Sequence, residues 1–384
     1  MEEKGKKTVP LSNPQISEGD IEVVVEVLKS GRLSIGKYTR MFEESIASYV
    51  GTKYAVAVSS GTSALHLIIK ALGFGKDDLL IVPSFTFVAS ANVALYEGGN
   101  VEFVDIEPET MNMDMEHFEQ VVEKNAGKYR SMFLMAVDVF GHPLDWDSVV
   151  NVCEKYDVKI IEDSCEALGS EYKGKKVGTF GLAGAFAFYP NKQITTGEGG
   201  IIVTDSDEIF KLSAAMRNQG RGEGQGWLSH DYIGYNYRID EMSAALGWSQ
   251  MKRIDTIIDK RNTVAKRYEE LLKDSGIETP KVMDYVTKMS WFVYVVRLPK
   301  PANKSIRDNV MKYLEENGIQ CRNYFSPVHL QRPYRELGWS EGTLSVTEDI
   351  SGRTIAIPFY TDLEKEDQEY VANHLRKAVE IFIK

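Results

Sequence analysis

Cysteine is scarce in this sequence, and the cysteines that occur are widely separated. Only Cys153, Cys165 and Cys321 are found among the 384 residues, and no two of them form a CxxC pair. An odd and scattered set of this kind argues against a disulfide framework and against a zinc site. Because free cysteines suit a reducing compartment, we expect a cytoplasmic protein without a bound metal.

Long apolar runs and long basic runs are also missing. No apolar stretch is long enough to cross a bilayer, and no signal-peptide core follows Met1–Lys7, whose first few residues we expect to form a solvated tail. With 45 basic against 56 acidic residues, the formal net charge is −11. This balance argues against nucleic acids and membranes as partners, although individual loops of an acidic protein can still bind a small anion.

What the sequence does contain is an alternation of short apolar segments with amphipathic segments. The apolar segments predict strands near residues 54–58, 79–82, 101–104, 132–139, 158–161, 186–188 and 201–204, and the amphipathic segments predict helices near residues 63–72, 87–96, 113–123 and 147–156. Strands that are apolar throughout indicate an α/β fold with a mainly parallel sheet sandwiched by helices. Ligands of such sheets gather at the C-terminal ends of the strands.

The pattern differs at both ends of the chain. Near the N-terminus, Ser17 is placed as the N-cap of a first helix, and a second helix is predicted near residues 38–49. One long helix is predicted over residues 240–272. Beyond it we expect a strand at residues 291–296, a helix near 305–317, a strand near Gln320 and a helix at 365–382. We therefore predict a large domain of residues 1–254 and a smaller C-terminal α+β domain of residues 255–384.

Lys192 follows an aromatic apolar run and precedes a segment rich in threonine and glycine. A lysine at the end of a buried strand loses hydration, which lowers its pKa and favours the neutral amine that attacks carbonyl groups. A surface lysine in a turn is the alternative, and for an isolated lysine it is the better interpretation.

A possible phosphate site follows the first strand of the sheet. Gly61, Thr62 and Ser63 combine small size and hydroxyl groups at the start of a helix, whose free N–H groups attract anions. Ordinary N-capping explains the same residues equally well. The segment matches neither the dinucleotide-binding pattern nor the P-loop pattern.

Two further strand ends carry a distinctive side chain. Asp163 could hold a proton on a heteroaromatic nitrogen, and Phe87 could stack on a flat ring. A solvated acidic turn and a core phenylalanine are the simpler interpretations of each residue alone. Together with Lys192 and the phosphate site, however, these residues are the set that pyridoxal phosphate (PLP) needs.

The same segments identify a family. Ser60–Leu65, Pro83–Ser90, Glu162–Asp163, Asn191–Gly200 and Tyr235–Arg238 resemble the DegT/DnrJ/EryC1/StrS family, and the resemblance runs from about residue 10 to the C-terminus. It implies a fold-type-I, PLP-dependent aminotransferase that acts on nucleotide-linked keto sugars, with pyridoxamine phosphate (PMP) as the aminated form of the cofactor.

The resemblance also implies roles for single residues. Lys192 matches the Schiff-base lysine that moves the proton, and Asp163 matches the partner of the ring nitrogen. Phe87 matches the stacking aromatic residue, while Gly61 and Thr62 match the phosphate cradle. Asn236 matches the asparagine that reaches the cofactor of the other subunit, which implies a homodimer with shared active sites.

Substrate contacts are implied for three more residues. Arg238 lies beside Asn236 and is expected to help hold the substrate. His329 lies in a region that often approaches the sugar, although a buried or capping histidine is an equal alternative. Tyr189, three residues before Lys192, is a further candidate for the substrate side, with packing as its simpler role.

Two positions depart from the commonest family pattern. Glu166 stands near the expected ring hydroxyl, where many members carry Gln or His. Perosamine-synthase-like members, which aminate a 4-keto-6-deoxy sugar, share this Glu. Ala187 replaces a phosphate-contacting serine, so the remaining contacts of the phosphate have to suffice.

The implied reaction moves an amino group from glutamate to a nucleotide-linked keto sugar, giving an amino sugar for a lipopolysaccharide or related glycan. A sugar dehydrase of the same fold is the first rival, but those members carry histidine in place of the lysine. A non-enzymatic regulator is the second rival, and the complete set of cofactor residues argues against it.

Overall fold

The computed structural model describes residues 7–222 and 229–383. The first six residues, part of the predicted solvated tail, lie outside this range. Helix α1 (Glu18–Ser30) begins at Ser17, whose side chain and that of Asp20 cap each other's backbone N–H groups, as the sequence predicted. Helix α2 (Lys37–Val50) follows and ends at Gly51, where the backbone turns left-handed.

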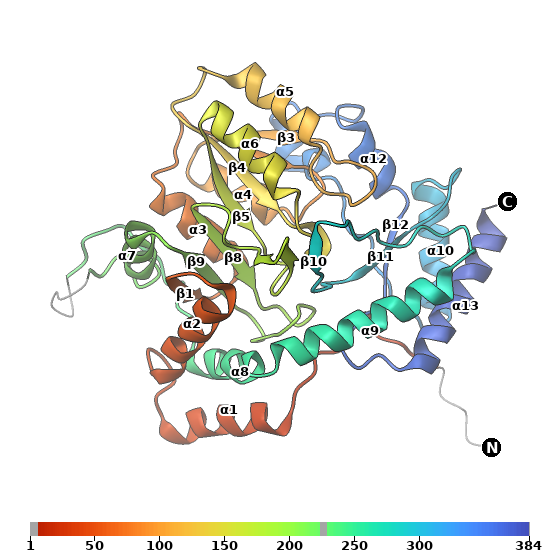
Figure 1. Ribbon diagram of the computed structural model, residues 1–384, viewed down its shortest axis with the longest axis horizontal. Helices are drawn as coiled ribbons and strands as arrows, with labels where there is room; N and C mark the ends of the chain where they lie inside the picture. Colours follow the sequence, from red (N-terminus) through yellow and green to blue (C-terminus); the bar gives the residue numbers. More distant parts are fainter. Residues whose placement is uncertain (1–6, 223–228, 384) are drawn as a thin grey trace.

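A seven-stranded sheet forms the centre of the molecule (Figure 1). Its strands lie in the order β1-β9-β8-β5-β4-β2-β3. They are β1 (Tyr54–Val58), β2 (Leu79–Pro83), β3 (Asn100–Val104), β4 (Met132–Val137), β5 (Val158–Asp163), β8 (Ala183–Ala187) and β9 (Gly200–Thr204). Only β9 runs antiparallel to its neighbours, β1 and β8, so the prediction of a mainly parallel sheet is confirmed.

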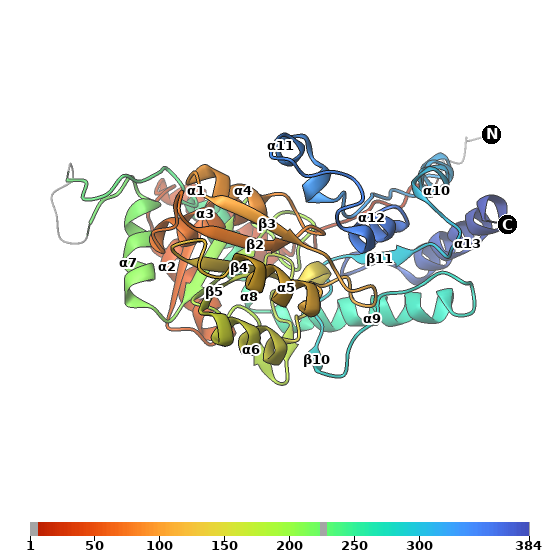
Figure 2. The same ribbon diagram turned by 90° about the horizontal axis from the view of Figure 1, so that it is seen from above.

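Helices cover both faces of this sheet (Figures 1 and 2). One face packs against α3 (Gly61–Ala71), α4 (Ala89–Tyr96) and α7 (Asp207–Met216). The other packs against α2 and α8 (Glu241–Met251) over one half, and against α5 (Met115–Asn125) and α6 (Trp146–Tyr156) over the other half. Strand side chains alternate between these cores: Val56 faces the first and Ala57 the second.

The predicted long helix of residues 240–272 is wrong in one respect, because it is two helices. Helix α8 ends at Met251 and α9 (Ile254–Leu272) begins after Arg253, whose backbone leaves the helical region. The Arg253 guanidinium donates to the Asp20 carboxylate and to the Gln15 carbonyl. Because Arg253 and Asp20 are far apart in the sequence, local helix propensity does not reveal this contact.

The C-terminal part has its own apolar core. Strands β11 (Tyr294–Arg297) and β12 (Thr354–Ile357) pair antiparallel and pack with α9, α10 (Lys304–Glu316) and α13 (Lys365–Phe382). Helix α9 runs from the large sheet to these helices (Figures 1 and 2). Val295 of β11 and Ala356 of β12 also pack in the core of the large sheet, and the predicted small domain with its boundary near residue 254 stays a prediction.

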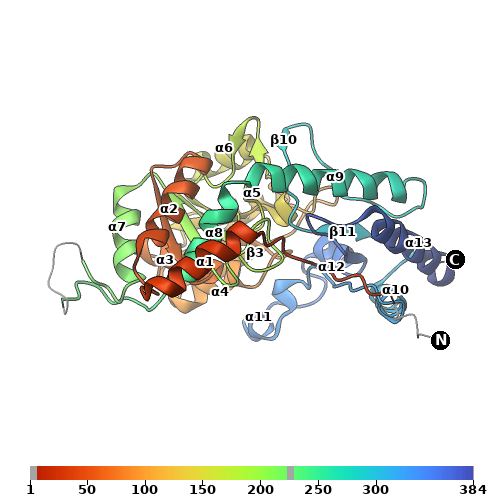
Figure 3. The same cartoon turned by 90° about the horizontal axis from the view of Figure 1, so that it is seen from below.

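The strand predicted near Gln320 does not form. Ile319 and Arg322 instead make single bridges to Val9 and Ala356, so this segment links the N-terminal segment to β12. Figure 3 shows the N-terminal segment running from the region of α10 along the molecule to α1. The strand predicted from Trp291 begins only at Tyr294, because Trp291 adopts a left-handed backbone with φ of 54°.

The remaining elements are short. They are β6 (Glu171–Tyr172), β7 (Lys175–Lys176), β10 (Val286–Lys288), α11 (Arg332–Glu336), α12 (Ser345–Ser351) and two 3-10 turns at Val139–Gly141 and Val328–Leu330. Within the described ranges, no helix is both long and apolar enough to cross a membrane. The same ranges contain no group of three or more His, Cys, Asp or Glu side chains placed to hold a metal ion.

Candidate active site

A cavity of about 630 Å³ opens at the C-terminal ends of the parallel strands. It is the place where the topology of an α/β sheet gathers ligands. Among the residues predicted from the sequence, it is lined by Gly61, Thr62, Phe87, Asp163, Glu166, Tyr189 and Lys192. These residues come from segments up to 131 positions apart, and the sheet brings them together.

The first turn of α3 forms one wall. Ser60 is the N-cap and accepts a 3.0 Å hydrogen bond from the Ser63 N–H, while Gly61 and Thr62 face the cavity. The Ser63 hydroxyl contacts the hydroxyls of Ser59 and Ser60, at 3.2 and 2.8 Å, and Ser63 does not line the cavity. The free end of the helix thus offers backbone N–H groups and the Thr62 hydroxyl to an anion.

Close backbone approach explains two glycines of this wall. A Cβ atom on Gly61 would lie 2.8 Å from Cβ of Ala187 and 2.9 Å from Sγ of Cys165. A Cβ atom on Gly200 would lie 2.3 Å from the Ser60 carbonyl oxygen. Only glycine fits at either position, and the N-terminus of α3 can therefore pack directly against β8 and β9.

Asp163 ends strand β5 with its carboxylate held from two sides. The Ser90 hydroxyl donates to Oδ2 at 2.6 Å, and the Cys165 N–H donates to Oδ1 at 3.2 Å. Asp163 is buried but still lines the cavity. A fixed carboxylate of this kind can hold the proton of a heteroaromatic N–H group.

Lys192 points its amine into the same cavity. Its Nζ lies 3.6 Å from Oε1 of Glu166 and 3.7 Å from the centre of the Phe292 ring. Burial raises the pKa of Glu166, while the Lys192 charge and the Phe140 N–H act in the opposite direction. The amine is thus held between a carboxylate and an aromatic face at the floor of the site.

Two aromatic residues stand where the cavity opens. Phe87, in the loop between β2 and α4, is 59% exposed, and Tyr189, just after β8, is 52% exposed. Both side chains also line the cavity. Both rings are available to a flat or sugar-like ligand.

Besides Ser63, three more predicted residues do not line this cavity. Asn236 is exposed in an extended segment that bridges to Asn218, and Arg238 donates to the Asn218 side chain at 3.0 Å. His329 is fully buried, in contact with the Ser84 hydroxyl at 2.6 Å and with Glu348 at 3.1 Å. The placement of His329 agrees with the alternative interpretation, in which it is a buried structural residue.

Sequence reasoning missed several residues that line the cavity. Cys165 and Phe292 line it, and the sequence assigned neither of them a role in the site. Ser90, in the Pro83–Ser90 segment, does not line the cavity but donates to Asp163, a contact that was also not predicted. Asn323, Tyr324 and Phe325 come from the C-terminal part and close the cavity opposite the sheet. No local signal marks these residues, because their place depends on how the chain returns to the sheet.

The residues present fit PLP. The cavity is roomy enough for a cofactor with a substrate, since ligand pockets commonly measure about 300–1,000 Å³. Its walls offer an amine, a hydrogen-bonded carboxylate, an exposed aromatic ring and a helix N-terminus that lacks side-chain bulk at Gly61. The amine matches the aldehyde of PLP, and the carboxylate matches its ring nitrogen. The aromatic ring matches the ring face of the cofactor, and the helix N-terminus matches its phosphate.

Comparisons with known proteins give the same picture. Residues 14–376 match the model of the DegT/DnrJ/EryC1/StrS aminotransferase family. The GDP-perosamine synthase of Escherichia coli O157:H7 is 34% identical over 373 residues, which is 97% of this chain and 98% of that protein. A protein of Geobacillus stearothermophilus named pleiotropic regulatory protein is 30% identical over 366 residues, covering 94% of each chain.

Solved structures are similar along the whole chain as well. A putative sugar aminotransferase from Streptococcus pneumoniae superposes in its PMP form with a TM-score of 0.92, at 26% identity over 98% of this chain and 99% of that one. Its PLP form gives a TM-score of 0.91, at the same identity.

Proposed function

The chain belongs to the DegT/DnrJ/EryC1/StrS aminotransferase family, and we propose that it moves an amino group from glutamate to a nucleotide-linked 4-keto-6-deoxy sugar. It is an aminotransferase of amino-sugar biosynthesis and uses PLP. The observation that carries the proposal is the meeting of Lys192 and Asp163 in one cavity large enough for a cofactor and a sugar.

Each residue of the site has a separate role in the proposed reaction. When bound, PLP supplies a carbonyl that carries the amino group and a ring that delocalises the electrons of a broken C–H bond. Asp163, fixed by Ser90, keeps the ring nitrogen protonated, and the first turn of α3 holds the phosphate. Lys192 would hold the cofactor, accept the proton from the α-carbon of the amino donor and release it at C4′ of the cofactor.

The sugar enters from the side of the C-terminal part. Phe292, Tyr324 and Phe325 line that side, and Tyr324 and Phe325 stack nearly parallel, with ring centres 5.2 Å apart. Aromatic faces suit the apolar faces of a sugar ring, and a 6-deoxy sugar has an additional methyl group to bury. Glu166 lies 3.6 Å from the Lys192 amine and completes the resemblance to perosamine-forming members.

A purified holoenzyme tests the donor and the acceptor separately. We expect L-glutamate alone to bleach the visible absorbance of the protein, and a nucleotide-linked 4-keto-6-deoxy sugar to restore it. Mass spectrometry over a panel of keto sugars should then detect the amino sugar. Bleaching by another amino acid but not by glutamate would refute the donor, and amination confined to sugars other than 4-keto-6-deoxy ones would refute the acceptor.

The active site is proposed to be shared between two copies of the chain. Asn236 is exposed and lies outside the cavity of its own chain, which suits a residue that reaches the phosphate in a second copy. The Lys192→Ala and Asn236→Ala variants should each be inactive alone. In a mixed dimer one site has both residues, so refolding the two variants together should restore about a quarter of the wild-type activity. No recovery from verified mixed dimers would refute shared sites.

A further inference from the structure

Arg261 carries a buried charge that no carboxylate neutralises among the residues described. It lies on α9 and is only 3% exposed. Its Nε donates to the carbonyl oxygen of Trp291 at 2.7 Å, and its Nη2 donates to that of Phe292 at 2.8 Å. Burial lowers the pKa of Arg261 to about 9. Backbone carbonyls therefore compensate this charge, and the arginine fixes the backbone of Trp291 and Phe292.

The segment held by Arg261 is the one that covers Lys192. The Phe292 ring lies 3.7 Å from the Lys192 amine, and the Phe292 N–H donates to the Phe140 carbonyl at 3.3 Å. Trp291 takes up a left-handed backbone, which is unfavourable for a bulky side chain and has to be held by its surroundings. The hydrogen bonds of Arg261 to the Trp291 and Phe292 carbonyls stabilise this conformation from the side of α9.

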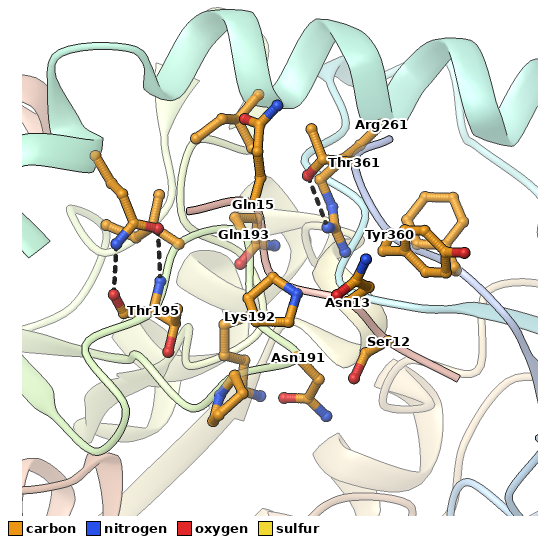
Figure 4. Close-up of a pocket in the computed structure, with 16 residues that line it drawn as sticks. Ser12, Asn13, Gln15, Asn191, Lys192, Gln193, Thr195, Arg261, Tyr360 and Thr361 are labelled. Atoms are coloured by element: carbon orange, nitrogen blue, oxygen red, sulfur yellow. Dashed lines mark hydrogen bonds between the residues drawn. The ribbon is translucent and has the colours of Figure 1, made fainter. Parts of the chain in front are cut away.

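Figure 4 shows Arg261 and Lys192 bordering the same small hollow, between residues 12–15 and residues 359–361. The hollow has a volume of about 10 Å³, which is room for a single water molecule at most. One guanidinium nitrogen reaches the Thr361 hydroxyl there, at 3.4 Å. No substrate group fits in this space, so Arg261 acts on the site through the backbone it holds.

We propose that Arg261 is a positioning residue for Lys192, because it fixes the backbone of Trp291 and Phe292 and so keeps the Phe292 ring over the Lys192 amine. The inference rests on the proposed role of Lys192 as the cofactor-binding lysine. An ammonium group over an aromatic face is attracted to it and shielded from solvent. Lys192 therefore stays in the cavity beside Glu166 whenever it is not bound to the cofactor.

The reactivity of Lys192 tests this without measuring turnover. The full-length chain, stripped of cofactor, is treated with a limiting amount of acetic anhydride, and acetylation of each lysine is followed by peptide mass spectrometry. The exposed Lys304 serves as the internal reference. We expect Phe292→Leu and Arg261→Met to raise the acetylation rate of Lys192 several-fold, and Arg261→Lys to give a smaller rise.

A double variant separates positioning from a general loosening of the fold. If Arg261 acts through Phe292, the variant with both Arg261→Met and Phe292→Leu should label Lys192 no faster than Phe292→Leu alone. The matched control is Lys260→Met, next to Arg261 on α9 but in an exposed ion pair with Asp362, and it should leave Lys192 unchanged. If Arg261→Met does not fold, the same comparison is made with Arg261→Lys. The variant with both Arg261→Lys and Phe292→Leu should then label Lys192 no faster than Phe292→Leu alone.

The inference is overturned if Phe292→Leu leaves Lys192 labelling at the wild-type rate, or if the effects of the two substitutions multiply. Failure of the proposed function would show differently. In that case borohydride would trap no cofactor on Lys192 of the wild-type protein, whereas the labelling rates of the stripped chain would still follow Arg261 and Phe292.

Discussion

The hydroxyl of Ser90 donates a 2.6 Å hydrogen bond to Oδ2 of Asp163, and both side chains are buried. Ser90 is the second residue of α4, whereas Asp163 is the last residue of β5. The bond therefore connects a helix on one face of the sheet to the end of a strand. A second hydrogen bond to Asp163 comes from the Cys165 N–H, so the carboxylate that lines the cavity is held in position from two sides.

Replacing Ser90 by alanine should weaken the site without unfolding the protein. A hydrogen bond to a charged group contributes about 1.5–3 kcal/mol, so kcat/KM of Ser90→Ala should fall by roughly one to two orders of magnitude. Ser90→Thr keeps the hydroxyl and is expected to retain most of the activity. Steady-state amination assays measure both variants, and wild-type kinetics for Ser90→Ala would show that the bond is dispensable.

A methyl group at Gly61 should impair cofactor binding. Its Cβ would lie within 2.9 Å of Ala187 and Cys165, so α3 has to move away from β8. Overpacking of this kind costs about 1–3 kcal/mol, and the cofactor dissociation constant of Gly61→Ala should rise by a corresponding factor. Gly75→Ala is the matched control, because a Cβ atom there meets nothing within 4 Å. A dissociation constant for Gly61→Ala equal to that of Gly75→Ala would contradict the packing argument.

His142 should make the stability of the fold depend on pH. Its Nε2 accepts from the Met283 N–H at 3.2 Å, its Nδ1 lies 2.8 Å from the Pro143 carbonyl, and burial lowers the pKa of His142 from 6.5 to about 4. The unfolded chain thus takes up a proton at a higher pH than the folded protein. The resulting stabilisation is complete above pH 6.5 and is lost as the pH falls towards 4.

The variant His142→Gln should flatten this dependence. Since one pKa unit corresponds to about 1.4 kcal/mol, the free energy of unfolding of the wild type should lose up to roughly 3 kcal/mol more than the variant over this pH range. Urea unfolding at several pH values measures the difference. The exposed His230, replaced in the same way, is the control. Parallel pH curves for wild type and His142→Gln would rule out the buried imidazole as the cause.

His329 should act on stability and not on the sugar. Its ring lies between the Ser84 hydroxyl and Glu348 and has no exposed surface. His329→Ala removes the ring that the buried Ser84 hydroxyl contacts, which costs about 1–3 kcal/mol of the free energy of unfolding. The KM for the sugar should stay near the wild-type value. A large rise in KM with unchanged stability would instead support the substrate role implied by the family resemblance.

Much of the site was predictable because the sheet architecture decides where strand ends meet. Gly61, Asp163 and Lys192 each follow an apolar strand, and parallel strands place such residues at one edge of the sheet. The antiparallel direction of β9 was not predictable in this way. Its residues are buried on both faces, so its pattern is the same for either direction.

What could not be predicted depends on contacts between distant segments. The break at Arg253 follows from its contact with Asp20, and the contact of Phe292 with Lys192 follows from the hold of Arg261 on the chain. Neither pair is marked by spacing or composition. For His329 the sequence was misleading in the other direction. The family resemblance implied a contact with the sugar, whereas the residue is fully buried.

Lys192 is proposed to be the residue that binds PLP covalently. The most direct test of this proposal is borohydride reduction of the holoenzyme, followed by peptide mass spectrometry to locate the reduced cofactor. We predict that the phosphopyridoxyl group is found on Lys192 and on no other lysine, and that Lys192→Ala carries none. A reduced cofactor on another lysine, or one that persists in Lys192→Ala, would contradict the account.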